Sequence, residues 1–302
     1  MSPTLKAHIA LFLVALIYGA NYTIAKIVMD GGYLHPVSFI LLRIATATTL
    51  FVLFHRLFIK EKIARKDYGR LALCGLFGVA INQLFFLMGL NWTSPINASL
   101  IMTTTPILVL IVSAILLGER ITSLKVLGIL VGAVGAGLLI AYGKKVSFDS
   151  QGLLGDLMIF INASSYGLYL VLARKLMKKY HPITVVKWVF IFGLLYVTPI
   201  SSPYIVHTDW ASFSLGIWLA VGYVLVFTTF FAYLFNAYAL SVVSPSIVSI
   251  YIYLQPLLAS LIAILWGVDV LTSVKLLAGT FIFVGVYLVS FAGRRRVVSK
   301  LD

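Results

Sequence analysis

The sequence predicts an all-α polytopic membrane protein whose ten transmembrane helices form two inverted five-helix repeats. Three observations lead to this fold class: the composition, the long uncharged stretches and an internal repeat. The chain has 302 residues, 61% of them hydrophobic and 11% charged, and its mean hydropathy is +1.06. A soluble domain averages about 45–50% apolar and about 25% charged residues. So few charges cannot cover a water-facing surface, and we therefore expect a lipid bilayer to surround the chain.

The internal repeat appears when the sequence is shifted against itself by 150 residues. The pairs that then align without a gap are Ser94-Pro95 with Ser244-Pro245, Pro106 with Pro256, Glu119 with Asp269, Thr122-Ser123 with Thr272-Ser273, Lys125 with Lys275, and Gly135 with Gly285. Such self-similarity indicates two copies of one unit of roughly 145 residues. We expect the units at 8–141 and 152–291, followed by a basic cytoplasmic tail at 292–302.

Uncharged runs locate the individual helices. Residues 71–118 and 211–268 contain no Asp, Glu, Lys or Arg. Each run exceeds the roughly 20 residues that one crossing needs, and each breaks at a turn-like cluster, 91–95 and 241–245. The predicted spans are 8–29, 37–57, 69–90, 97–117, 124–142, 152–174, 183–200, 213–237, 247–267 and 274–292. Five spans per unit is an odd number, so the second unit enters the membrane inverted, an architecture typical of secondary transporters.

The distribution of basic residues predicts the orientation. With a cytoplasmic N-terminus, 17 of the 23 Lys and Arg residues fall in cytoplasmic segments, and three, Lys144, Lys145 and Lys275, fall outside. This split follows the positive-inside rule, so we expect both termini in the cytoplasm of a cell whose inner membrane holds the protein. The same distribution explains the net charge of +14 without nucleic acid as a partner.

The sequence contains none of the motifs that we associate with enzymatic chemistry. It contains no P-loop, no H-E-x-x-H and no nucleophile elbow. Its single cysteine, Cys74, lies in an apolar run, and the five histidines are scattered over predicted span ends. We therefore expect no catalytic residues, no metal site and no cofactor. The expected partners are a small-molecule substrate and the lipid bilayer, with the chain acting as a monomer or a homodimer.

Several motifs occur in a recognisable order. The first span reads Tyr18-Gly19-Ala20-Asn21 and continues to Lys26, His35-Pro36 follows, and Arg43 lies inside the second span. The fourth span carries Pro106 and ends Leu117-Gly118-Glu119-Arg120-Ile121-Thr122, before a fifth span containing Gly128, Gly132, Gly135 and Gly137. This order resembles the EamA-type branch of the drug/metabolite transporter superfamily over nearly the whole chain. The resemblance implies ten helices and transport of small metabolites or drugs, often outward.

The second unit departs from the pattern of that family. Val268-Asp269-Val270 stands where the first unit has Gly118-Glu119-Arg120, and Tyr169 stands at the equivalent of Asn21. Position 18 is Tyr rather than the usual Trp. The two halves therefore have divergent roles.

Charges within the spans are costly and usually face the protein interior or a cavity. Lys26 either snorkels to the outer headgroups or serves as a counter-charge for an anionic group, since Tyr18, Tyr22 and Lys26 form one stripe at i, i+4 and i+8. We expect a structural role for Arg43, tying its helix to backbone carbonyls, to Asp30 or to Asp156. Asp156 is the only candidate carboxylate in a predicted span, so uniport or exchange fits the sequence as well as proton antiport does.

Polar and aromatic side chains at equivalent depths in both halves favour a shared cavity, although any one of them alone is more often an interhelical hydrogen bond than a substrate contact. The candidate substrate-binding residues are Tyr18, Asn21, Tyr22, Lys26, Asn82, Gln83, Tyr166, Tyr169, Tyr233, Asn236, Tyr251 and Gln255. Residues with candidate structural or gating roles are Arg43, Pro106, Pro256 and Asp156, the prolines because each removes a helical hydrogen bond mid-membrane.

Together these features predict a secondary transporter, an exporter of small organic metabolites by alternating access. Lys26 favours an amino acid or a related solute, because it suits a carboxylate. The alternatives are an exporter of cationic drugs and a channel, although no selectivity-filter sequence is present.

Overall fold

The computed structural model describes residues 1–93, 95–141, 150–206, 208–265 and 271–298. Within these residues there are ten helical spans long and apolar enough to cross a membrane, and there are no strands. The prediction of an all-α membrane protein with ten spans is confirmed.

The first half contains five spans, three of them continuous. These are α1 (Pro3–Asp30), α2 (Pro36–Phe58) and α7 (Ser123–Ala141). The third span is built from η1 (Arg65–Asp67), α3 (Tyr68–Gly75), η2 (Leu76–Ile81) and α4 (Asn82–Trp92), and the fourth from α5 (Pro95–Met102) and α6 (Thr105–Leu117).

The second half repeats this plan. Its continuous spans are α8 (Ser150–Lys179), α9 (Pro182–Ile205) and α14 (Ser273–Val298). After η3 (Trp210–Ser212), the eighth span is built from α10 (Leu215–Tyr223), η4 (Val224–Phe231) and α11 (Ala232–Val242). The ninth span consists of α12 (Pro245–Ile250), η5 (Tyr251–Tyr253) and α13 (Leu254–Leu265).

Several helices extend beyond their predicted ends. The helix α1 begins at Pro3, where the Ser2 side chain accepts a hydrogen bond from the Leu5 backbone N–H, and α9 continues past Pro199 to Ile205. Apolar runs predict the part of a helix that crosses hydrocarbon, whereas the backbone keeps its helical hydrogen bonds into the interfacial layer. Charged or proline-containing ends were therefore missed.

Matching caps begin the second span of each half. His35 precedes α2 and accepts a hydrogen bond from the Val37 backbone N–H, and His181 precedes α9 and accepts one from Ile183. Each histidine is followed by proline at the first helical position, where a missing N–H costs nothing. The repeat is thus preserved in the local chemistry that starts these helices.

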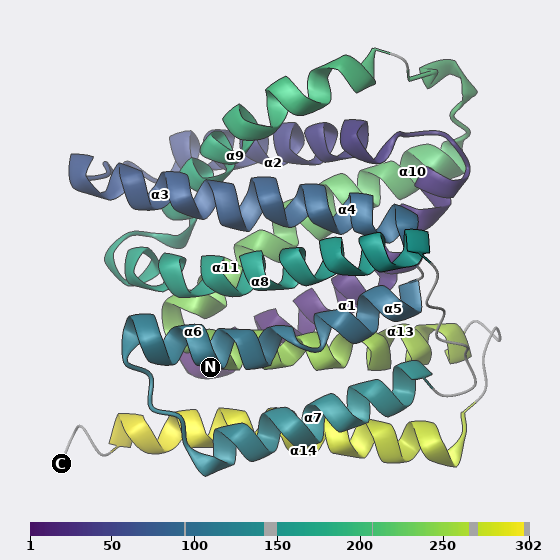
Figure 1. Ribbon diagram of the computed structural model, residues 1–302. Coiled ribbons are helices and arrows are strands. Elements are labelled where there is room, and N and C mark those ends of the chain that lie inside the picture. The colour runs from purple at the N-terminus through teal and green to yellow at the C-terminus, as the bar shows by residue number, and fades with distance from the viewer. Residues whose placement is uncertain (94, 142–149, 207, 266–270, 299–302) are drawn as a thin grey trace.

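The two halves interleave rather than standing apart (Figure 1). The helix α1 packs on α11 and α13 of the second half, while α8 packs on α4 and α6 of the first half. The remaining equivalent helices pair with each other, α2 with α9 and α7 with α14. Each contact therefore has a counterpart with the halves exchanged, as two inverted repeats require.

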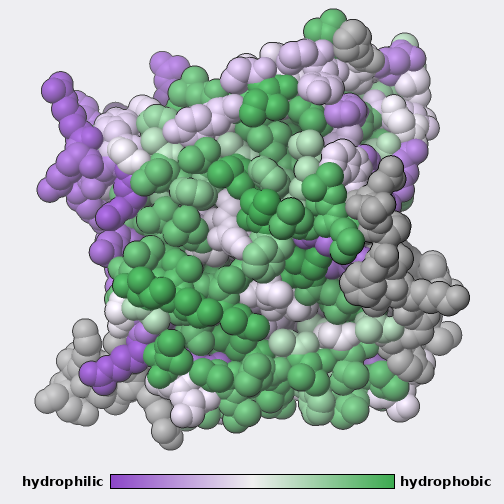
Figure 2. Space-filling view, viewed as in Figure 1, coloured by the Kyte–Doolittle hydropathy of each residue, from purple (hydrophilic) through white to green (hydrophobic). Residues whose placement is uncertain are grey.

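The outer surface is apolar where a bilayer would contact it. Figure 2 shows a broad hydrophobic face, with hydrophilic residues gathered where the helices end. Leu130, Leu157 and Phe283 are each more than half exposed. Large apolar side chains in these positions suit lipid tails as the surrounding solvent.

Glycines bring α7 and α14 into close contact. A Cβ atom on Gly285 would lie 2.6 Å from the Gly128 carbonyl oxygen, and one on Gly135 would lie 2.7 Å from the Ala278 carbonyl oxygen. A Cβ on Gly137 would meet nothing within 4 Å. The small residues at 128, 132 and 135 thus pack against another helix of the same chain.

The fourth and ninth spans are interrupted next to their prolines. Pro106 occupies the first turn of α6 after a break at Thr103 and Thr104, and Pro256 follows the 3₁₀ segment η5. The Tyr253 hydroxyl of η5 donates a hydrogen bond of 3.1 Å to the Thr103 carbonyl oxygen. The two interruptions are therefore joined directly across the repeat interface.

Candidate functional site

The third and eighth spans each contain a π-helical segment at mid-length, η2 and η4. A π segment widens the helix and leaves backbone carbonyls free to accept hydrogen bonds from other groups, and such segments often occur at functional sites. Three carbonyls in or beside η2 accept from neighbouring helices. Ser165 Oγ donates to Phe77, the Tyr233 hydroxyl to Gly78 at 2.8 Å, and Asn162 Nδ2 to Asn82 at 2.6 Å.

In the eighth span, the contact with a neighbouring helix is made by the side chain of Thr229 in η4 rather than by a backbone carbonyl. Its hydroxyl donates to the Val224 carbonyl oxygen at 2.9 Å and accepts a hydrogen bond of 3.0 Å from Arg43 Nε of α2. The two π segments thus position polar side chains from α2, α8 and α11 around the centre of the molecule.

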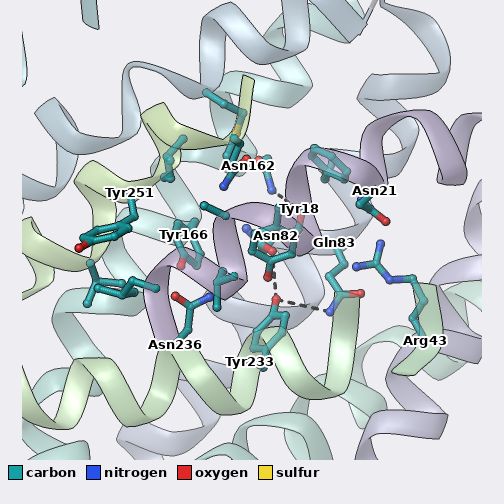
Figure 3. Close-up of a pocket in the computed structure, with 18 residues that line it drawn as sticks. Tyr18, Asn21, Arg43, Asn82, Gln83, Asn162, Tyr166, Tyr233, Asn236 and Tyr251 are labelled. Atoms are coloured by element: carbon teal, nitrogen blue, oxygen red, sulfur yellow. Dashed lines mark hydrogen bonds between the residues drawn. The ribbon is translucent and has the colours of Figure 1, made fainter. Parts of the chain in front are cut away.

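Arg43, Asn162 and Tyr233 are among the residues that surround a cavity of about 80 Å³ (Figure 3). Nine of the twelve candidate substrate-binding residues line it: Tyr18, Asn21, Asn82, Gln83, Tyr166, Tyr233, Asn236, Tyr251 and Gln255. They come from α1, α4, α8, α11, η5 and α13, so both halves contribute. The Tyr233 hydroxyl also lies 3.3 Å from Asn82 Oδ1 and 3.5 Å from Gln83 Nε2, which links the polar walls of the two halves.

Two of the candidates do not line the cavity, and one lies outside the described side chains. Tyr169 is buried behind Tyr166, with the ring centroids 6.2 Å apart, and it fills the space over Gly78. The Tyr22 side chain lies outside the described part of the structure.

Lys26 is the main correction to the predicted site. Its Nζ atom lies 3.4 Å from the Leu90 carbonyl oxygen and 3.5 Å from Asp30 Oδ1, away from the cavity-lining residues. The helical spacing correctly aligns Lys26 with Tyr18 on one face. However, eight residues correspond to about 12 Å along the helix, which carries the lysine past the cavity to the helix end.

Arg43 is the second correction. It contacts neither Asp30 nor Asp156 but lies on the wall of the cavity, 4% exposed, with the hydrogen bond to Thr229. Its Nη1 atom is buried and has no hydrogen-bond partner among the described residues. Asp156 instead accepts from Thr93 Oγ1 at 2.5 Å and from Asn97 Nδ2 at 3.3 Å, which ties α8 to the start of the fourth span.

Hydrogen-bond acceptors on the same cavity also lack partners. Asn21 Oδ1, Gln83 Oε1 and Asn162 Oδ1 are buried without a donor among the described residues. A buried polar group without a partner is costly, and native proteins contain few of them. This cavity therefore combines a free cationic donor with free neutral acceptors.

The apolar part of the wall was missed from the sequence. Leu11 and Val14 of α1, Phe86 of α4 and Met102 of α5 line the cavity with the polar residues. The first two precede Tyr18 by seven and four residues and so lie on its helix face, a signal that spacing alone contained. Phe86 and Met102 carry no comparable signal in a chain this apolar.

The comparisons with known proteins agree with this architecture. The model of the EamA-like transporter family matches residues 5–141 and 153–291. The "Uncharacterized transporter YyaM" of Bacillus subtilis is 29% identical over 272 residues, which cover 88% of each chain. The "Probable terminal-alkyne amino-acid exporter" of Streptantibioticus cattleyicolor is 24% identical over 97% of each chain.

Solved structures share the fold, and one of them is a crystal structure that aligns over nearly the whole chain. It superposes with a TM-score of 0.76 over 96% of this chain and 98% of the other, at 20% sequence identity. The family match covers both halves of the chain, and its relatives are transporters. The protein is therefore a multi-pass membrane transporter that belongs to the EamA-like transporter family.

Proposed function

We propose that the protein is a secondary carrier that exports small organic metabolites, preferably amino acids or related solutes, by alternating access. The observation that carries this proposal is the central cavity, whose polar and aromatic walls come from both inverted halves. Polar anchors set among apolar walls are typical of small-molecule sites, and transporter sites occur at the interface between repeats.

Matched contacts at the helix ends support a mechanism in which the halves rock against each other. Near the end of α1, Lys26 Nζ contacts the Leu90 carbonyl oxygen of α4. Near the end of α8, Arg174 donates to the carbonyl oxygens of Leu240 and Val242 of the eighth span. These contacts lie at opposite ends of the inverted repeat, so we assign one to each gate. The breaks beside Pro106 and Pro256 supply the flexible points.

The preference for amino acids has two supports. The first is the similarity over 97% of the chain to a protein described as a probable exporter of a terminal-alkyne amino acid. The second is Arg43, which gives the cavity a positive charge that suits a carboxylate and repels a cation. Cationic drugs are therefore the weaker alternative.

For the location, we propose the inner membrane of the cell with both termini cytoplasmic. The basis is the excess of Lys and Arg in alternate loops, because short basic loops remain on the cytoplasmic side. Outward transport would then start from the face that carries both chain ends.

Counterflow in proteoliposomes tests the carrier function. Vesicles loaded with each of the 20 common amino acids in turn are given the labelled compound outside, with imposed pH, Na⁺ and voltage gradients. We expect saturable flux that a solute on the opposite face accelerates, because a carrier must return through its loaded state. Ala15→Phe, which fills a cavity-lining position, serves as the blocked control. Non-saturable flux without counterflow would instead indicate a channel.

A further inference from the structure

Arg43 is a buried cation with few polar contacts among the described residues. Within the described residues its hydrogen bonding consists of Nε to Thr229 Oγ1, and no carboxylate lies within ion-pair distance. Its Nη1 atom has no partner, although the side chain is 4% exposed. Figure 3 shows the guanidinium group pointing toward the part of the cavity lined by Gln83 and Asn21. The donor thus lies in the wall of the cavity without a hydrogen-bond partner among the described residues.

The equivalent position in the other half shows that the fold does not require this charge. Counted from the His-Pro pair that begins each helix, Arg43 corresponds to Val189, and by the 150-residue shift Thr229 corresponds to Val79. Both valines are fully buried. The same helix crossing is therefore packed with aliphatic side chains in one half and with an arginine and a threonine in the other.

A charge near the centre of a membrane is costly to insert, and the valine pair shows that the helices can pack there without one. A buried charge with a purely architectural role is normally paired, whereas this one retains a free donor at a cavity. Asn21 Oδ1 and Gln83 Oε1 belong to residues that line the same cavity, and neither atom has a hydrogen-bond partner among the described residues. The set matches a ligand that brings a carboxylate and a hydrogen-bond donor together.

We propose that Arg43 binds the carboxylate of the transported solute, while the amide oxygens of Asn21 and Gln83 accept hydrogen bonds from its ammonium group. The carrier thereby selects zwitterionic α-amino acids. This inference rests on the proposed carrier function, and it assigns the binding of the carboxylate to Arg43 instead of Lys26. Guanidinium suits the role because it offers a planar fork of donors that matches a carboxylate.

A series of matched ligands tests the carboxylate contact and the ammonium contact separately. A simple carboxylic acid would pair with Arg43 but leave the amide oxygens without donors, whereas an amino-acid amide would leave the guanidinium group without an anion. We therefore expect the free amino acid to have a lower KM than either its amide or its deaminated acid. Leucine, leucinamide and 4-methylpentanoate form one such series, which suits the apolar walls near Leu11 and Val14.

The test measures KM and kcat for such a series, built on the best amino acid found by counterflow, in wild type and three variants. For Arg43→Gln we expect the KM of the amino acid to rise roughly thirtyfold or more, as when one partner of a buried charge pair is removed. The KM of the amide should not rise, because the amide has no carboxylate to lose its pairing with Arg43. Arg43→Lys should recover part of the loss, because it restores charge without the fork.

Lys26→Gln is the matched control, since it removes a cation that contacts Leu90 and Asp30 rather than the cavity. We expect its ratio of KM values for amino acid and amide to equal that of wild type. Folding is followed by thermal unfolding, in which Arg43→Gln should remain as stable as wild type because it removes an unpaired charge.

The outcomes separate this inference from the carrier function. If Arg43→Gln weakens the amino acid and its amide equally, or leaves both unchanged, Arg43 is architectural and the inference fails while transport stands. A KM for the amide that equals or lies below that of the free amino acid in wild type also overturns the inference alone. An absence of solute-accelerated flux for every compound overturns the carrier function itself.

Discussion

Ionisable side chains inside the molecule are stabilised in different ways. Glu119 and Lys125 are both less than a tenth exposed and form an ion pair of 2.6 Å, to which the Arg120 carbonyl oxygen adds a further acceptor at 3.2 Å. Arg43, by contrast, has a hydroxyl group for a partner. The Glu119–Lys125 pair thus stabilises the loop after α6, where Gly118 adopts φ +62° and lets the Glu119 N–H bond to the Ser113 carbonyl oxygen. Among the described residues, the buried Lys125 has a counter-charge, as an architectural role requires, whereas Arg43 has none, which supports the binding role proposed for it.

The Glu119–Lys125 pair provides a stability prediction. Glu119→Gln should destabilise the protein by about 3–5 kcal/mol, because it leaves the Lys125 ammonium group buried and unpaired. The double variant with Lys125→Met should recover most of that loss. Asp30→Asn is the control, since its carboxylate is 56% exposed and should contribute at most about 1 kcal/mol. Reversible unfolding in detergent measures all four proteins, and equal losses in the two single-site variants would contradict the assignment.

Tyr233 provides a second prediction at the same scale. Tyr233→Phe removes the donor to the Gly78 carbonyl oxygen and should cost about 0.5–2 kcal/mol, the range for interhelical hydrogen bonds in membranes. Tyr238→Phe makes the same chemical change at a half-buried residue whose hydroxyl has no hydrogen bond to a described residue, and should have little effect. Thermal unfolding of the two variants compares them. A larger loss for Tyr238→Phe would refute the role given to the π segment.

The shape of the site depends on the places where the helices depart from regular α-helical geometry. The π segments η2 and η4 present the polar side chains, and the breaks before α6 and around η5 lie at the repeat interface. Regular helices provide the frame, since α7 and α14 are continuous and glycine-packed. We therefore expect motion to be concentrated in the broken spans.

The frame is tested by adding one methyl group. Gly285→Ala should force α7 and α14 apart, because its Cβ would lie 2.6 Å from the Gly128 carbonyl oxygen and 2.7 Å from the Gly132 Cα. A loss of about 1–3 kcal/mol is typical for such overpacking. Gly137→Ala adds the same methyl group in open space and should be neutral or slightly stabilising. Similar unfolding midpoints for both variants would contradict the close approach.

At the scale of the molecule, the sequence predicted the fold well because membrane insertion depends on composition and length. It predicted most of the cavity wall because helical spacing sets which side chains share a face. It failed for Lys26, because spacing gives the direction of a side chain but not the depth of a cavity. It did not identify the hydrogen-bond partner of Arg43, because Thr229 lies 186 residues away on a π segment that no sequence motif indicates.

The orientation provides the prediction for the whole molecule. Reporter proteins fused after Lys145 and Asp302 should report opposite sides of the membrane, because five spans separate the two positions. The fusion at residue 302 should be active as a cytoplasmic reporter, in agreement with the basic loops. Signals from the same side would refute the inverted repeat, and exchanged sides would refute the orientation alone.

The helix-end contacts of Lys26 and Arg174 are unequal, and this has a kinetic consequence. Lys26 reaches one carbonyl oxygen of α4, whereas Arg174 reaches two in the eighth span. If opening toward each side breaks one of these contacts, the two openings differ in free energy. A difference of about 1.4 kcal/mol corresponds to a tenfold ratio of the two populations. We therefore expect the empty carrier to rest with the arginine end shut, so that solute uptake at that end is the slower step.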